Sequence, residues 1–99
     1  MALGGWILEN ETYTLRLPPG SVKTIGRTAR ADFIVNGALV SRIHCRVTAD
    51  RSGQLVVEDL ESTNGILVNG ENTERAVLRD GDTLTVGRVE FSVREAKDS

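Results

Sequence analysis

Short alternating or apolar runs, each followed by turn-forming residues, make up most of this chain. The runs cover residues 12–17, 22–25, 33–35, 44–48, 55–60, 66–68, 76–78, 83–86 and 89–93. No window shows apolar residues sustained at the i, i+3, i+4, i+7 spacing of an amphipathic helix. Close strands without helices predict an all-β domain, and the pattern favours an antiparallel β-sandwich.

Glycine, asparagine and proline separate the runs. Pro18-Pro19-Gly20 predicts a turn, because proline fixes φ and lacks an amide donor. Asn69-Gly70 is a strong hairpin signal, because a two-residue turn needs positive φ at its centre. We expect Trp6 to pin the first strand to the sandwich, and Cys45 to pack in the core with the apolar residues on its face.

The chain has 99 residues, enough for one core and too few for two independent domains. We expect a single domain over residues 6–94, with flexible ends at residues 1–5 and 95–99. A hydrophobic fraction of 39% disfavours disorder. No apolar run approaches the roughly 20 residues of a membrane helix. The first residues lack the basic and apolar regions of a signal peptide, and a single cysteine favours a reducing compartment.

The formal net charge of −2 disfavours binding to nucleic acid, because such domains are usually basic. One stretch of 24 residues is nevertheless basic and contains a single acid, Asp32. Its basic residues are Lys23, Arg27, Arg30, Arg42 and Arg46. The stretch is therefore a candidate site for an anionic ligand.

Three polar segments between the expected strands have the chemistry that a phosphate monoester needs. They are Gly26-Arg27, the run from Ser41 to His44, and the run from Ser62 to Gly65. Arginine supplies a permanently charged fork of donors, and short hydroxyl side chains add neutral donors. Glycine-containing turns add backbone N–H groups. Since loops at one end of a rigid sandwich often bind ligands, these segments predict a phosphate site.

The same segments resemble the forkhead-associated (FHA) domain. That family carries Gly-Arg, then Ser-x-x-His, then Thr-Asn-Gly, with an Asn-Gly turn soon after. This chain has Gly26-Arg27, Ser41 to His44, Thr63 to Gly65 and Asn69-Gly70 in that order, and the resemblance covers about residues 6–94. It implies an antiparallel β-sandwich of about eleven strands that binds phosphothreonine peptides through loops at one end.

The resemblance also implies a role for each residue of the site. Arg27, Ser41, Arg42 and Thr63 are expected to bind the phosphate, and Asn64 the main chain of the peptide. The residues expected to hold the loops in shape are Gly26, His44, Gly65 and Asn69. Leu39 falls where some relatives place a charged residue that reads the peptide, so its apolar character leaves the sequence preference open.

Two other functions stay open at this point. Ser41, His44 and Asp59 could form a nucleophile, base and orienting acid, although the chain has one histidine and no G-x-S-x-G elbow. We therefore expect no enzyme and no cofactor. We also expect no metal site, because His44 and Cys45 are strand neighbours that point to opposite faces. An FHA-like structural domain that binds partners independently of phosphate is the second alternative.

The expected partners are phosphothreonine-containing proteins, without nucleic acid, membrane or metal. The placement of Trp6 near the start of the chain is reminiscent of nibrin-like DNA-damage adaptors, and checkpoint kinases begin with such domains as well. This resemblance predicts nuclear DNA-damage signalling, with the cytoplasm as the alternative location.

Overall fold

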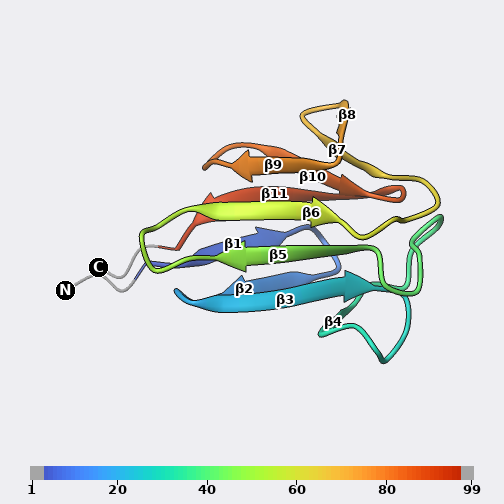
Figure 1. Ribbon diagram of the computed structural model, residues 1–99, viewed down its shortest axis with the longest axis horizontal. Helices are drawn as coiled ribbons and strands as arrows, with labels where there is room; N and C mark the ends of the chain where they lie inside the picture. Colours follow the sequence, from blue (N-terminus) through green and yellow to red (C-terminus); the bar gives the residue numbers. More distant parts are fainter. Residues whose placement is uncertain (1–3, 97–99) are drawn as a thin grey trace.

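The protein is a sandwich of two packed β-sheets, which the computed structural model describes over residues 4–96 (Figure 1). Its strands are β1 (Trp6–Glu9), β2 (Thr14–Leu17), β3 (Ser21–Gly26), β4 (Phe33–Ile34), β5 (Cys45–Ala49), β6 (Leu55–Asp59), β7 (Ile66–Val68), β8 (Glu71–Thr73), β9 (Arg75–Leu78), β10 (Thr83–Val86) and β11 (Val89–Glu95). The six-stranded sheet has the order β2-β1-β11-β10-β7-β8, and the five-stranded sheet has the order β4-β3-β5-β6-β9. The expected all-β sandwich is confirmed.

Alternation along the strands builds the core between the two sheets. In β5, Cys45, Val47 and Ala49 are buried, while the residues between them are half-buried on the outer face. From the six-stranded sheet, Leu8 and Phe91 are fully buried against them. Burying each large apolar side chain contributes about 1.5–3 kcal/mol. The core thus gives the loops at its ends a rigid support.

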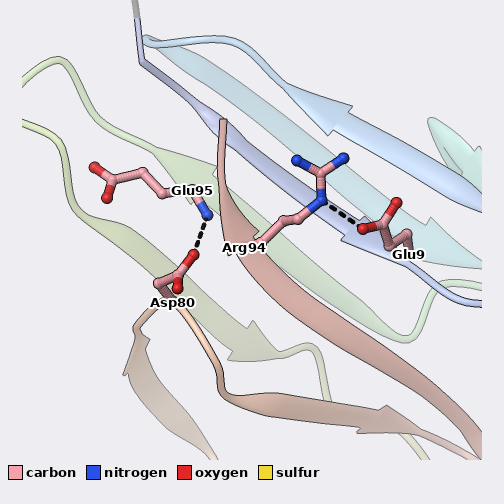
Figure 2. Close-up of polar contacts among 4 residues, drawn as sticks. All are labelled: Glu9, Asp80, Arg94 and Glu95. Atoms are coloured by element: carbon pink, nitrogen blue, oxygen red, sulfur yellow. Dashed lines mark hydrogen bonds and ion pairs between the residues drawn. The ribbon is translucent and has the colours of Figure 1, made fainter. Parts of the chain in front are cut away.

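Side chains near the chain ends fasten the two sheets and the last strand. Trp6 is buried as expected, and its indole N–H donates to the Gly53 carbonyl in the β5–β6 hairpin of the other sheet, at 3.3 Å. Figure 2 shows β11 held on both sides, because Arg94 pairs with Glu9 of β1 and the Asp80 carboxylate accepts the Glu95 amide at 2.8 Å. The Arg94 guanidinium lowers the pKa of Glu9.

Among the strand pairs of residues 4–96, the short pairing of β3 with β4 is parallel, within a sandwich that is otherwise antiparallel as expected. β4 pairs with β3 in parallel over two residue pairs, Ile25 with Phe33 and Gly26 with Ile34. After β3 the chain loops back and runs beside the end of β3 in the same direction, because Asp32 closes the intervening loop. Its carboxylate accepts the Thr24 amide at 2.9 Å, and its own amide donates to the Thr24 hydroxyl at 3.0 Å. These hydrogen bonds from Thr24 lower the pKa of Asp32.

The Asn69-Gly70 hairpin forms as predicted, with φ of 53° and 84° at its two residues. It joins β7 to β8, a strand that the apolar pattern did not predict because it carries no large apolar residue. The Asn69 side chain also accepts the Thr83 amide at 2.9 Å and donates to Asp82 at 3.1 Å. Asn69 therefore ties the hairpin to the start of β10.

The connections that carry the candidate residues lie at the end of the sandwich opposite the two chain ends (Figure 1). The β1–β2 and β10–β11 turns lie at that same end. Of the terminal segments, residues 1–3 and 97–99 lie outside the described residues. Within the described part, β11 continues to Glu95, and the Ala96 amide donates to the Gly5 carbonyl at 2.9 Å. In residues 4–96, no helix is long and apolar enough to cross a membrane.

Candidate functional site

Three connections meet at this end, and we call them the site loops: residues 27–32, 35–44 and 60–65. Main-chain hydrogen bonds join the first two, because the Arg27 amide donates to the Ser41 carbonyl at 2.9 Å and the Thr28 amide to the Arg42 carbonyl at 3.4 Å. The third loop joins them through the Thr63 amide, which donates to the Ser41 hydroxyl at 3.1 Å. Residues far apart in the sequence are thereby fixed next to one another.

Gly26 lets the second loop lie directly on β3. A Cβ atom at Gly26 would lie 2.1 Å from the Arg42 carbonyl oxygen, which is far inside van der Waals contact. No other residue type fits without moving the backbone of the Arg42 loop. The expected structural role of Gly26 therefore has a direct steric cause.

His44 is the buried link between the second and third loops. Its side chain is fully buried, its Nδ1 accepts the Ser41 amide at 3.0 Å, and its Nε2 lies 2.7 Å from the Gly65 carbonyl oxygen. These partners assign the proton to Nε2, which donates to Gly65, and leave Nδ1 as the acceptor. The predicted hydrogen bond between His44 and the Ser41 loop is confirmed.

Asp59 and Ser62, for which the sequence predicted no loop-holding role, hold the turn of the third loop. The Ser62 hydroxyl donates to the Asp59 carboxylate and accepts the Gly65 amide at 2.8 Å. The Ser62 amide also donates to Asp59, at 3.3 Å. An acid three residues before a serine is a recognisable turn pattern, so their spacing was a usable signal.

A closed circuit of hydrogen bonds results. It passes from the turn held by Ser62 through Gly65 to His44, from His44 to Ser41, and from Ser41 back to Thr63. Every buried side-chain polar atom in residues 4–96 has a partner. Satisfied polar networks of this kind hold one geometry, so the circuit gives the loops a defined shape before any ligand arrives.

The Arg27 side chain is oriented by a main-chain carbonyl of the second site loop. Its Nε donates to the Val40 carbonyl at 3.0 Å, which fixes the plane of the guanidinium. Its terminal nitrogens have no partner among the described residues, so they remain available to an anion. Arg42 is exposed, and its side chain also lacks an ion pair within residues 4–96. Two arginines from adjoining loops thus have side-chain nitrogens without a partner in residues 4–96.

The second and third loops also carry neutral polar groups. The Ser41 hydroxyl oxygen accepts the Thr63 amide, which leaves the hydroxyl hydrogen for another acceptor. Thr63 is exposed at the surface of the third loop. Asn64 is exposed as well, and its Nδ2 donates to the Leu39 carbonyl at 3.2 Å, which spans the second and third loops. Its Oδ1 and remaining N–H can still bind a peptide main chain.

Leu39 has an unusual backbone conformation beside Asn64. Its φ is 65°, and its side chain is half exposed. A left-handed backbone costs a residue with a side chain about 1–2 kcal/mol. Gly87 of the β10–β11 turn approaches so closely that a Cβ there would lie 2.7 Å from the Leu39 carbonyl. The Arg88 amide donates to the Ala38 carbonyl at 3.0 Å, so the β10–β11 turn braces this loop.

The site does not contain the alternative catalytic arrangement. Both ring nitrogens of His44 bind main-chain groups, and the Ser41 hydroxyl interacts with Thr63 rather than with His44. Asp59 binds Ser62. No group of three or more potential metal-ligating side chains forms within residues 4–96.

Cys45 lies behind the site and is fully buried, as predicted for a core residue. Burial raises the pKa of the Cys45 thiol to about 12, and the Asp59 carboxylate adds to the effect.

Asn69, which was expected to hold the loops in shape, lies on the hairpin at the far end of β7. Its contacts are with Asp82 and Thr83, so it supports the fold outside the three loops.

Comparison with known proteins places these features in a family. The family model described as "FHA domain" matches residues 23–87. An ABC transporter ATP-binding/permease protein of Mycobacterium tuberculosis is 37% identical over 85 residues, which are 86% of this chain and 10% of that protein. The chain therefore spans about a tenth of that relative's length.

Two solved structures have the same fold and are also similar in sequence. One, from a study of phosphothreonine-dependent FHA domain interactions, is 33% identical with a TM-score of 0.80 and covers 92% of this chain and 94% of its own. The other is Mycobacterium tuberculosis EmbR in complex with a low-affinity phosphopeptide, which is 27% identical with a TM-score of 0.80 and covers 96% of this chain and 25% of its own. With the family model matching well over half of its residues, the chain belongs to the forkhead-associated (FHA) domain family.

Proposed function

We propose that this domain, over residues 6–94, binds partner proteins that carry phosphothreonine. The observation that carries the proposal is the hydrogen-bond circuit around His44, which fixes Ser41 and Thr63 beside the two arginines. A phosphate monoester has a charge of about −1.5 to −2 and three strong acceptor oxygens. The site offers such a group two positive charges and several fixed donors in one place.

Each residue then has a separate task. Arg27 donates from its free terminal nitrogens to the phosphate, because its Nε is already held by Val40. Ser41 donates its hydroxyl hydrogen, and Arg42 adds a second charge from the neighbouring position. Thr63 contributes its hydroxyl and keeps the loop in place through its amide. Asn64 binds the peptide main chain with the amide groups that Leu39 leaves free.

The relatives support binding rather than catalysis. One similar structure comes from a study of phosphothreonine-dependent interactions, and EmbR was solved with a phosphopeptide. Both belong to proteins similar to this chain at 27–33% identity. Such a domain recruits a phosphorylated partner and needs no cofactor or metal for that task.

The cellular setting is a separate proposal. The transporter and EmbR are mycobacterial proteins, and bacteria have no nucleus. They give no support to the expected nibrin-like or checkpoint-kinase-like identity in nuclear DNA damage. We propose the cytoplasm, the alternative location, and regulatory phosphorylation in general as the setting of this domain. Imaging of the fluorescently tagged protein in its own cells tests this proposal, and accumulation in a nucleus would contradict it.

The binding proposal is tested by calorimetric titration with a degenerate peptide library around a fixed phosphothreonine and with its unphosphorylated twin. We expect binding of the phosphorylated library alone. Arg27→Ala should weaken it by at least about 2 kcal/mol, or about 30-fold, since a hydrogen bond to a charged group contributes roughly 1.5–3 kcal/mol. Arg51→Ala is the matched control, because this exposed arginine lies in the β5–β6 hairpin at the other end. Equal affinities for the two libraries would favour the phosphate-independent alternative.

A further inference from the structure

A surface hollow of about 490 Å³ lies beside the site loops and takes no part in the proposed phosphate site. Three segments line it: the β1–β2 turn at residues 10–13, the start of the second site loop at Asn36 and Gly37, and residues 88–90 of the β10–β11 hairpin. All three lie at the loop end of the sandwich (Figure 1).

Hydrogen bonds cross-link the walls of this hollow. Asn10 accepts the Thr12 and Tyr13 amides, both at 2.8 Å, and its Nδ2 donates to the Glu90 carbonyl at 3.0 Å. The Tyr13 hydroxyl accepts the Asn36 amide at 2.9 Å. The β1–β2 turn is therefore tied to both other walls, and the hollow has a fixed shape before a ligand binds.

Its chemistry combines an apolar lining with unpaired charges. Tyr13 and Val89 are half-buried and pack on the core. Glu11, Glu90 and Arg88 are exposed at the hollow, and none of them forms an ion pair within residues 4–96. Two carboxylates and one guanidinium leave a formal charge of −1. Such a surface fits a side chain with an apolar stem and a cationic head, which is an arginine or a lysine.

The hollow is continuous with the proposed phosphate site through one loop. Gly37 lines the hollow, and Ser41, four residues later, belongs to the site. Four residues span at most about 14 Å, because an extended chain advances no more than 3.6 Å per residue. Arg88 donates its amide to Ala38 and so lies next to this shared wall. An extended bound peptide therefore reaches the hollow within about four residues of its phosphothreonine.

We propose that the hollow binds a basic side chain of the same phosphorylated partner, and so selects phosphothreonine segments with an arginine or lysine at that distance. This inference rests on the proposed function. The phosphate then provides the main affinity, and the Glu11 and Glu90 carboxylates provide sequence preference and orientation.

The test uses alanine- and serine-based phosphothreonine peptides in which one arginine is moved through each position on both sides of the phosphothreonine. An otherwise identical peptide without arginine, and one with glutamate, are the references. We expect one position within about four residues of the phosphothreonine to improve the affinity about three- to tenfold, since an exposed ion pair contributes roughly 0.2–1 kcal/mol and two carboxylates and the apolar stem act together. Glutamate there should weaken binding.

The double variant Glu11→Gln, Glu90→Gln should abolish the arginine preference and keep the affinity for the arginine-free peptide. The matched control is Glu71→Gln, Glu74→Gln, which removes two exposed carboxylates elsewhere and should keep the preference. Phosphate-dependent binding without preference at any position would overturn the inference and leave the proposed function intact. If the Glu11 and Glu90 double variant lost the same affinity for all peptides, with or without arginine, the inference would also be overturned. Absence of phosphate dependence would refute the proposed function itself.

Discussion

Replacing His44 by alanine should damage folding and binding together. The imidazole is fully buried and has two main-chain partners, the Ser41 amide and the Gly65 carbonyl. His44→Ala leaves both groups without a partner, at about 1–3 kcal/mol for each buried group. A water molecule can occupy part of the space and recover some of this free energy. We therefore expect the free energy of unfolding to fall by about 2–4 kcal/mol.

Two measurements on the same sample check this prediction. A loss of 1 kcal/mol lowers the Tm of a domain of this size by roughly 4–8 °C, so thermal unfolding should show a fall of at least about 8 °C. Titration with a phosphothreonine peptide, at a temperature where the variant is still folded, should show affinity at least about tenfold weaker. The reason is that Ser41 and Thr63 lose the link that places them beside Arg27.

The control for a general loss of stability is Leu55→Ala. Leu55 is fully buried at the start of β6, at the end of the sandwich away from the site loops. Truncating a buried leucine costs about 2–5 kcal/mol, and this variant should keep its peptide affinity while folded. Full stability with lost binding in His44→Ala would indicate direct contact with the ligand. Lost stability with unchanged affinity would show that the circuit does not position the loops.

Four further outcomes are expected. Asp59→Asn should lower the urea midpoint, because the turn around Ser62 loses a charged acceptor, and an unchanged midpoint would contradict this role. Raising the salt concentration should weaken phosphopeptide binding, less so in Arg42→Ala, and a salt-independent dissociation constant would indicate an apolar interface. A phosphothreonine peptide should bind about tenfold better than its phosphoserine twin, because burying the extra methyl contributes about 0.8 kcal/mol and the β-branch stiffens χ1; equal affinities would show that the site reads phosphate alone. Because the pKa of Cys45 is raised to about 12 in the folded protein, its contribution to stability is complete below the unfolded pKa of about 8.5 and is lost as pH rises above it. In urea titrations at alkaline pH, the free energy of unfolding should fall by up to about 1.4 kcal/mol per pH unit. Cys45→Ala should flatten this dependence, and an unchanged slope in that variant would contradict the raised pKa of Cys45.

Local patterns were sufficient for most of the fold. Leu15 and Leu17 alternate with polar residues and are buried in β2, and Asn69-Gly70 forms the hairpin that its turn chemistry predicts. Features set by contacts between distant segments could not be predicted in this way. The parallel β3–β4 pairing depends on the bonds of Asp32 with Thr24, and the positive φ of Leu39 on the approach of another turn.

In the site, too, local motifs were predictable and contacts between distant segments were not. A family motif gave the positions of Ser41 and His44, and His44 makes the predicted hydrogen bond. The motif did not indicate that the Val40 carbonyl orients the Arg27 side chain, nor that the Asn64 side chain donates to the Leu39 carbonyl. Those bonds join residues 13 and 25 positions apart, so they follow from tertiary packing and not from local sequence.

The measurement that tests the central proposal most directly is an amide chemical-shift titration of the isotope-labelled domain. The ligands are a phosphothreonine peptide and its unphosphorylated twin at equal concentrations. We predict that only the phosphorylated peptide shifts resonances, and that the largest shifts are those of Arg27, Ser41, Arg42, Thr63 and Asn64. Shifts of equal size with both peptides, or shifts centred on the outer face of the five-stranded sheet around Val22 and Val77, would contradict a phosphothreonine site in these loops.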